Sequence, residues 1–141
     1  MPDDCIFCRI ARHEAPASIV YEDEVVVAFL DTTPINPGHT LVIPRRHAAQ
    51  LADLEPSEAA PIWEAARSVA GGLRQSGLRC DGINLHLADG PAAGQEVVHL
   101  HLHVIPRWRG DGAGLRRPPG FGAKAPRSDL EVVAKAIRER M

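Results

Sequence analysis

Apolar positions along the chain repeat with two different periods, and the order of these patterns predicts an α+β fold. Short segments rich in Val, Ile and Leu, bounded by turn residues, indicate strands. The predicted strands are residues 19–21, 25–30, 40–43, 82–87 and 97–105. The third ends at Pro44, which cannot donate a hydrogen bond to a sheet. Short strands in this order predict an antiparallel sheet of about five strands.

Two segments before and between these strands have helical spacing. Residues 6–11 predict a short N-terminal helix, and a main helix begins near Pro56. The ends of the main helix are weakened by Pro61 and by the glycine pair Gly71–Gly72. The apolar stripe of the main helix consists of Ile62, Ala66, Val69 and Leu73.

The last quarter of the chain combines a long connection with a predicted C-terminal helix. Residues 107–127 are rich in Gly, Pro and Arg, and both a solvated loop and a flap that contacts substrate fit this composition. Ser128 and Glu131 have the spacing of a capping box, so we expect the helix to begin there. Its apolar stripe would consist of Leu130, Val133, Ile137 and Met141.

Length and charge narrow the class of protein. A chain of 141 residues fits one domain over residues 1–141. Its 16 Lys and Arg nearly balance 18 Asp and Glu, which argues against binding nucleic acid or a membrane surface through net charge. No segment approaches the ~20 apolar residues that cross a bilayer, and the N-terminus lacks a signal-peptide pattern. We therefore expect a cytoplasmic protein that binds neither nucleic acid nor a membrane.

The most informative segment is the predicted strand at 97–105, which carries three alternating histidines. On a strand His99, His101 and His103 share one face, and successive histidines lie about 7 Å apart. One metal ion would therefore hardly bind all three. A solvent-facing polar strand is the simpler explanation, although Thr, Lys or Glu would serve it better. A neutral imidazole is a nucleophile near pH 7 when a hydrogen bond fixes its tautomer.

A glycine-containing turn precedes the histidines. Gly94 permits close backbone approach, so the amides of residues 95–97 are expected to face a phosphate oxygen. Such a turn is a weak signal alone, but beside three histidines it completes a phosphoryl-transfer site, with a nucleophile and donors that stabilise the transition state.

The sequence His-Leu-His-Leu-His-Val-Ile at 99–105 resembles the signature of the histidine triad (HIT) family, in its bacterial and archaeal branch of histidine triad nucleotide-binding proteins. Further segments resemble that branch at 5–10, 29–31, 34–44, 93–95 and 105–107, whereas the region after Trp108 matches least. The resemblance implies a HIT-like fold and a homodimer. It also implies cleavage of phosphoramidates or dinucleoside polyphosphates at the α-phosphate of a purine nucleotide, through a nucleotidyl-histidine, with an AMP-like product and no organic cofactor.

The resemblance assigns roles to individual residues. His101 matches the nucleophile and His103 the group that contacts the phosphate or the leaving group. Asp31 matches the carboxylate that accepts the ribose hydroxyls, with Thr32 beside it. The phosphate would bind at Gly94, Gln95, Glu96 and Val97, and the base in an apolar cleft of Phe7, Ile10 and Phe29. Those three residues fit an ordinary core equally well.

Cys5 and Cys8 form a Cys-x-x-Cys pair, which by itself indicates zinc, redox chemistry or chance. An odd number of cysteines argues against a disulfide framework. Members of the resembling branch carry zinc, and His47 and His99 would complete a Cys₂His₂ site. The expected role is structural, and redox chemistry is disfavoured because the strand–helix context is missing.

One position departs from the family pattern. Ala88 stands where Asn or Gln is expected to reach the phosphate, and one donor can be worth about 100-fold in rate. Asn84, about 13 Å further along the strand, is no substitute. Two other functions therefore stay open: a zinc-stabilised nucleotide-binding module with little or no catalysis, and metal-dependent hydrolysis at the histidines.

Overall fold

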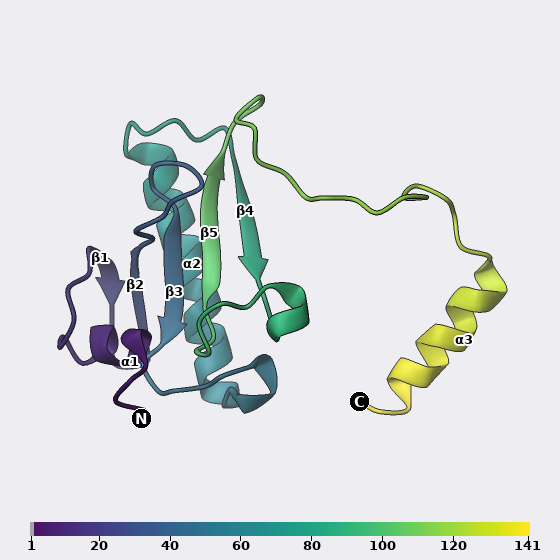
Figure 1. Cartoon of the computed structure of the whole chain (residues 1–141), viewed down its shortest axis with the longest axis horizontal. Helices are drawn as coiled ribbons and strands as arrows, with labels where there is room; N and C mark the ends of the chain where they lie inside the picture. The colour runs from purple at the N-terminus through teal and green to yellow at the C-terminus, as the bar shows by residue number, and fades with distance from the viewer. Residues whose placement is uncertain (1) are drawn as a thin grey trace.

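The computed structural model describes residues 2–141; Met1, the first residue of the predicted domain, lies outside it. Five antiparallel strands form one sheet in the order β1-β2-β3-β5-β4, which confirms the predicted α+β class (Figure 1). The elements are α1 (Ile6–Ala11), β1 (Ile19–Glu22), β2 (Val26–Leu30), β3 (Thr40–Pro44), the 3₁₀ helix η1 (Leu51–Asp53), α2 (Pro56–Gln75), β4 (Gly82–Leu87), the 3₁₀ helix η2 (Pro91–Ala93), β5 (Leu102–Arg107) and α3 (Arg127–Arg138).

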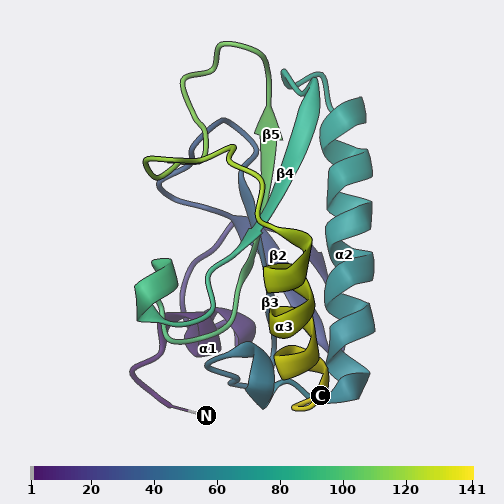
Figure 2. The same ribbon diagram turned by 90° about the vertical axis from the view of Figure 1, so that its right-hand side faces the viewer.

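The sheet is covered on both faces, by α2 on one and by α1 on the other (Figure 2). Strand alternation explains this division, since neighbours on one strand point to opposite faces. Along β2, Val26 and Ala28 pack beneath α2, whereas Val27 and Phe29 pack against α1. On the α2 face, Leu102 of β5 also joins the core.

The histidine strand is shorter than predicted. β5 begins at Leu102, so Val97–His101 is not a strand and two of the three histidines lie in an irregular approach to the sheet. The ladder stops because β3 ends at Pro44, which lacks an N–H, and the amide of Leu100 instead donates to the carbonyl of Ala48 at 2.7 Å.

The helices differ from prediction in two respects. The capping box at Ser128 and Glu131 is wrong, because Pro126 is the N-cap and no side chain caps α3. The fixed φ of Pro126 starts the helix one residue earlier, which places Ser128 inside the first turn. Pro61 does not interrupt α2, which is continuous over 20 residues. None of the helices in residues 2–141 combines the length and apolar character needed to cross a membrane.

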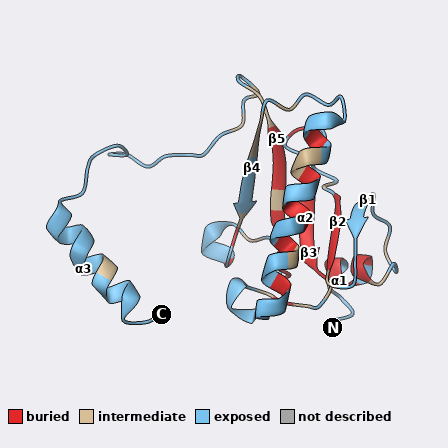
Figure 3. Ribbon diagram, turned by 180° about the vertical axis from the view of Figure 1, so that it is seen from behind, coloured by how far each residue is buried: buried red, intermediate tan, exposed pale blue. Residues whose placement is uncertain are grey.

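The C-terminal part of the chain leaves the body as an extended arm. Residues 112–126 contain neither helix nor strand, and α3 contains no buried residue. Seen from behind, almost all of the arm is exposed (Figure 3). The helix that the sequence predicts therefore forms without the packing partner that its apolar stripe requires within this chain.

Gly38 combines a left-handed conformation with close packing against α2. Its φ is +97°, and a Cβ there would lie 2.7 Å from Leu73 Cδ2. We expect Gly38→Ala to lower the free energy of unfolding by about 2–4 kcal/mol, because left-handed strain adds to overpacking. Gly77→Ala is the matched control, since Gly77 has φ +83° and no atom within 4 Å. In urea unfolding it should lose only about 1–2 kcal/mol; equal losses would contradict the overpacking.

Candidate active site

The irregular segment before β5 still presents its histidines to one face of the sheet, the face covered by α1. His99 is fully buried and His101 is only 7% exposed. The ring of Phe7, on α1, packs edge-on against the ring of His101 with centroids 5.2 Å apart. The short N-terminal helix therefore packs directly against the histidines.

A main-chain contact determines the tautomer of His101. Its Nδ1 lies 2.8 Å from the carbonyl oxygen of His99. A carbonyl only accepts hydrogen bonds, so Nδ1 carries the proton and the lone pair of Nε2 is free. The neutral ring of His101 thus has the tautomer that a nucleophilic imidazole needs.

A second series of contacts orients His103. The amide of Ile35 donates to Nδ1 of His39 at 3.0 Å, which leaves the proton of His39 on Nε2. That nitrogen lies 2.8 Å from Nδ1 of His103, so His103 accepts there and keeps its own proton on Nε2. Burial, followed by the neighbouring imidazoles, lowers the pKa of His103 to about 4. Near pH 7, His103 is therefore a neutral hydrogen-bond donor.

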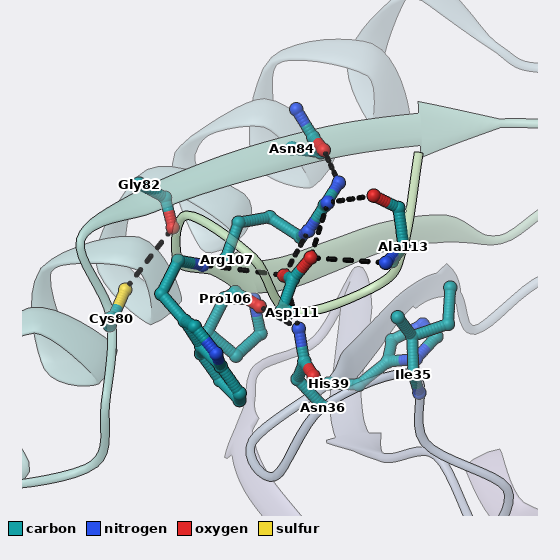
Figure 4. Close-up of polar contacts among 11 residues, drawn as sticks. Ile35, Asn36, His39, Cys80, Gly82, Asn84, Pro106, Arg107, Asp111 and Ala113 are labelled. Atoms are coloured by element: carbon teal, nitrogen blue, oxygen red, sulfur yellow. Dashed lines mark hydrogen bonds and ion pairs between the residues drawn. The ribbon is translucent and has the colours of Figure 1, made fainter. Parts of the chain in front are cut away.

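A polar cluster fixes the turn that carries Ile35 (Figure 4). Asn36 donates to the carbonyl of Pro106 and to Asp111 Oδ2, both at 2.9 Å. Arg107 pairs with both oxygens of Asp111, at 2.6 and 2.8 Å, and holds the pKa of that carboxyl well below its usual range. The cluster thereby ties the start of the arm to the turn behind His39.

The predicted residues converge on one cavity of about 420 Å³ between α1, β2 and the segment before β5. One end is apolar and the other carries the two histidines. Nine predicted residues line it: Phe7, Ile10, Phe29, Asp31, Thr32, Glu96, Val97, His101 and His103. Six lining residues were not predicted: Ile6, Pro16, Ala17, Leu30, Thr33 and Leu41.

Of the residues that sequence reasoning missed, Thr33 has a recognisable signal. Its amide donates to Asp31 Oδ1 at 2.8 Å and its hydroxyl lies 3.2 Å from the same oxygen. This is the Asx turn that an Asp-x-Thr sequence favours. It orients Asp31 so that Oδ2 lies 3.6 Å from His39 Nε2.

Gly94 and Gln95 do not line the cavity. The amide of Gly94 donates to Pro91 and that of Gln95 to Gly90, while the Gln95 side chain donates to Ala49 and accepts from Gly90. Their contribution is to shape the turn. Among the four predicted phosphate-binding residues, the amides of Glu96 and Val97 have no main-chain or side-chain acceptor within residues 2–141, so both are free to donate to a phosphate.

Beside the cavity, four side chains form a cluster suited to a metal ion. The ligand atoms of Cys5, Cys8, His47 and His99 all lie within 4.8 Å of one another. His99 Nε2 donates to the carbonyl of Pro44 at 2.8 Å, so its Nδ1 lone pair faces the sulfurs of Cys5 and Cys8 at 3.4 and 3.5 Å. Ligand atoms around tetrahedral zinc are about 3.5 Å apart, so the set fits that ion.

The environment of this cluster favours the neutral forms of Cys8 and His99. Burial, with Cys5 nearby, raises the pKa of the Cys8 thiol to about 11, and burial lowers the pKa of His99 to about 4. A neutral imidazole is the form that binds a metal, and a divalent ion would offset the cost of a buried Cys8 thiolate.

Residues 12–110 match the family model of the HIT domain. The chain belongs to the HIT family. A plant HIT protein, adenylylsulfatase HINT3 of Arabidopsis thaliana, is 36% identical over 76% of this chain and 54% of its own length. The crystal structure of a zinc-bound histidine triad family protein from Mycobacterium smegmatis is also similar, with 45% sequence identity and a TM-score of 0.75. The match covers 82% of this chain and 84% of the mycobacterial chain.

A second solved HIT structure informs the placement of the arm. The crystal structure of a HIT family protein of Bacillus anthracis is 35% identical, covers all of this chain and 99% of its own, and has a TM-score of 0.89. Residues 112–141 are about a fifth of this chain. Superposition of the other four fifths alone could not give a score of 0.89, so at least part of the arm has a counterpart in the same place in the bacterial HIT protein.

The low pKa values of His99 and His103 predict instability in acid. In the unfolded chain the pKa of both histidines returns to about 6.5. Between pH 6.5 and 4 the unfolded state therefore binds more protons than the folded state. The free energy of unfolding then falls as the pH drops through this window and is unaffected above it. In urea titrations from pH 8 to 4, His103→Asn should make this decline shallower. An equally steep decline would contradict the assignment to His103.

Proposed function

We propose that this HIT protein is a nucleotide hydrolase or transferase that cleaves at the α-phosphate through a nucleotidyl-His101 intermediate. The observation that carries the proposal is the contact between His101 Nδ1 and the His99 carbonyl, which leaves Nε2 free beside the cavity. An imidazole with no catalytic role would not need this tautomer fixed within a ligand-sized cavity.

In the first step Nε2 of His101 attacks the α-phosphorus and the bond to the leaving group breaks. The positive charge that develops on the imidazole is shared with Nδ1–H, which points at the His99 carbonyl. The neutral His103 donates a hydrogen bond to a phosphoryl or leaving-group oxygen, and the amides of Glu96 and Val97 stabilise the phosphate. Water then attacks phosphorus and restores His101; its protons end on the nucleoside monophosphate and the leaving group.

The cavity supports a purine nucleoside monophosphate moiety as the bound group. Phe7 and Phe29 pack edge-on with centroids 5.4 Å apart and supply an apolar wall for a base. Asp31 at the margin would accept the ribose hydroxyls. Phosphoramidates, dinucleoside polyphosphates and, by analogy with the plant adenylylsulfatase, adenylyl sulfate all present this moiety.

A nucleotide-binding module with little catalysis is the second candidate. Ala88 favours it: the residue is buried, with 5% exposed, and offers only a methyl group where the family pattern has a donor. In metal-dependent hydrolysis, the third candidate, Asp31, His39 and His103 would hold the ion. The hydrogen bond between the two imidazoles and that from Ile35 already occupy three of their nitrogens, which disfavours this candidate.

We also propose a homodimer, located in the cytoplasm. β4 is an edge strand with its outer side unpaired in residues 2–141. Beside it, Trp63 on α2 is 63% exposed and Leu85 on β4 is 41% exposed. An apolar patch at a free sheet edge is typical of an interface between copies.

Zinc in the Cys₂His₂ cluster would be structural and would hold α1 on the sheet. We expect about one zinc per chain by elemental analysis. Cys8→Ser should lose the metal and lower the melting temperature by on the order of 10 °C. Cys80→Ser is the control, because Cys80 lies outside the cluster with its thiol 3.4 Å from the Gly82 carbonyl. Full zinc content in Cys8→Ser would refute this ligand set.

Intact-protein mass spectrometry after brief incubation with an adenylated lysine or tryptamine phosphoramidate tests the reaction. The wild type should gain one adenylyl group, and His101→Gly should gain none and lose at least about a thousandfold in turnover. His13→Gly is the control, since His13 is exposed and already has φ +60°. No adduct and no turnover with several nucleotides in the wild type would favour the binding module.

A further inference from the structure

The helix at the end of the arm has an apolar stripe with nothing packed on it. Leu130, Val133 and Ile137 recur at helical spacing and are 42%, 55% and 56% exposed. An isolated helix of 12 residues is marginal in water, because its nucleation cost is not recovered without packing. The sequence and the extended placement therefore require a partner surface.

A groove elsewhere on the same chain has the complementary character. It has a volume of about 490 Å³ and lies between α2 and the β1–β3 end of the sheet. Its walls are mostly aliphatic and aromatic, and three wall residues, Val20, Tyr21 and Leu78, are 51%, 39% and 43% exposed. Such a concave apolar surface suits the stripe of an amphipathic helix.

The path of the arm separates this helix from its own groove. The arm leaves the end of β5, passes the β4 edge and places α3 beyond that edge, whereas β1 and the groove lie at the opposite edge of the sheet (Figure 1). At least part of the arm has a counterpart in the same place in the HIT protein of B. anthracis. The arm thus points to the side on which a second copy would meet the free β4 edge.

We propose that α3 of each chain docks in the groove of a second copy, so that two chains exchange their C-terminal arms. This inference rests on the homodimer proposed above and adds its means of closure. Each chain supplies one helix and one groove. In a two-fold symmetric dimer both helices and both grooves are therefore occupied, and no further chain can be added.

The exchange would also reach the nucleotide cavity. Leu30 lines both the groove and the cavity, and Asp31 follows it directly. Gly38, at the floor of the groove, belongs to the turn between Ile35 and His39. A helix docked there from the second copy would pack against the supports of the ribose carboxylate and of His39.

Light scattering on full-length variants tests whether the stripe holds the dimer. The double variant Val133→Glu, Ile137→Glu should raise the dimer dissociation constant at least tenfold. Val132→Glu is the matched control, because Val132 is 71% exposed on the opposite side of α3, and it should leave the constant unchanged. Equal effects of the two variants, or none from the double variant, would overturn the proposal.

A cross-link distinguishes exchange from docking of α3 in the groove of its own chain. The fifteen residues of the arm at 112–126 span about 50 Å when extended, so the helix could also reach its own groove. In a Cys80→Ser background, differently tagged chains carrying either Val133→Cys or Leu78→Cys are mixed and treated with diamide. Exchange predicts a disulfide-linked product with both tags. A doubly substituted chain that closes only on itself, with no mixed product, would overturn exchange.

The same samples separate this proposal from the proposed activity. If the adenylyl-His101 adduct forms but no mixed cross-link does, arm exchange is wrong and the hydrolase stands. If the mixed cross-link forms without adduct or turnover, exchange stands and the hydrolase is wrong.

Discussion

The arrangement of the site depends on hydrogen bonds between imidazole nitrogens and the main chain. The carbonyl of His99 fixes the proton of His101, the carbonyl of Pro44 fixes that of His99, and the amide of Ile35 fixes that of His39 and through it His103. Each contact leaves one lone pair or one N–H pointing in a required direction. Because these carbonyls and this amide do not titrate, the tautomers of the neutral rings depend on the path of the main chain.

Helix α1 connects the Cys₂His₂ cluster with the cavity beside the histidines. Cys8 faces the cluster, and Phe7, next to it in sequence, packs against Phe29, His99 and His101. A six-residue helix has little intrinsic stability. The wall of the base cleft therefore depends on whatever holds the cluster together, which is a physical reason for a Cys₂His₂ set this close to the cavity.

Local pattern predicted the elements well, because strands and helices here follow their hydrophobic periods. Tertiary constraints account for the errors. The early end of the ladder at Pro44 and the Leu100–Ala48 contact shorten β5, and neither is visible in the alternation of histidines. The cavity residues were predicted largely through the family resemblance, whereas spacing alone supplied the triad and the Cys-x-x-Cys pair. The sequence assigns Gln95 to the phosphate, whereas in the structure its side chain bonds to Gly90 and Ala49, because a polar residue beside a glycine turn can hydrogen-bond to the turn as well as to a ligand.

The dependence on main-chain contacts has an evolutionary consequence. Positions 35 and 44 serve the histidines through an amide and a carbonyl, atoms that nearly every residue possesses. At position 35 the requirement for an N–H excludes only proline, so the side chain there can vary while the contact with His39 is kept. A comparison scored by side-chain identity would pass over such a position, whereas an insertion or deletion in its turn would displace His39 and His103 with every histidine still present.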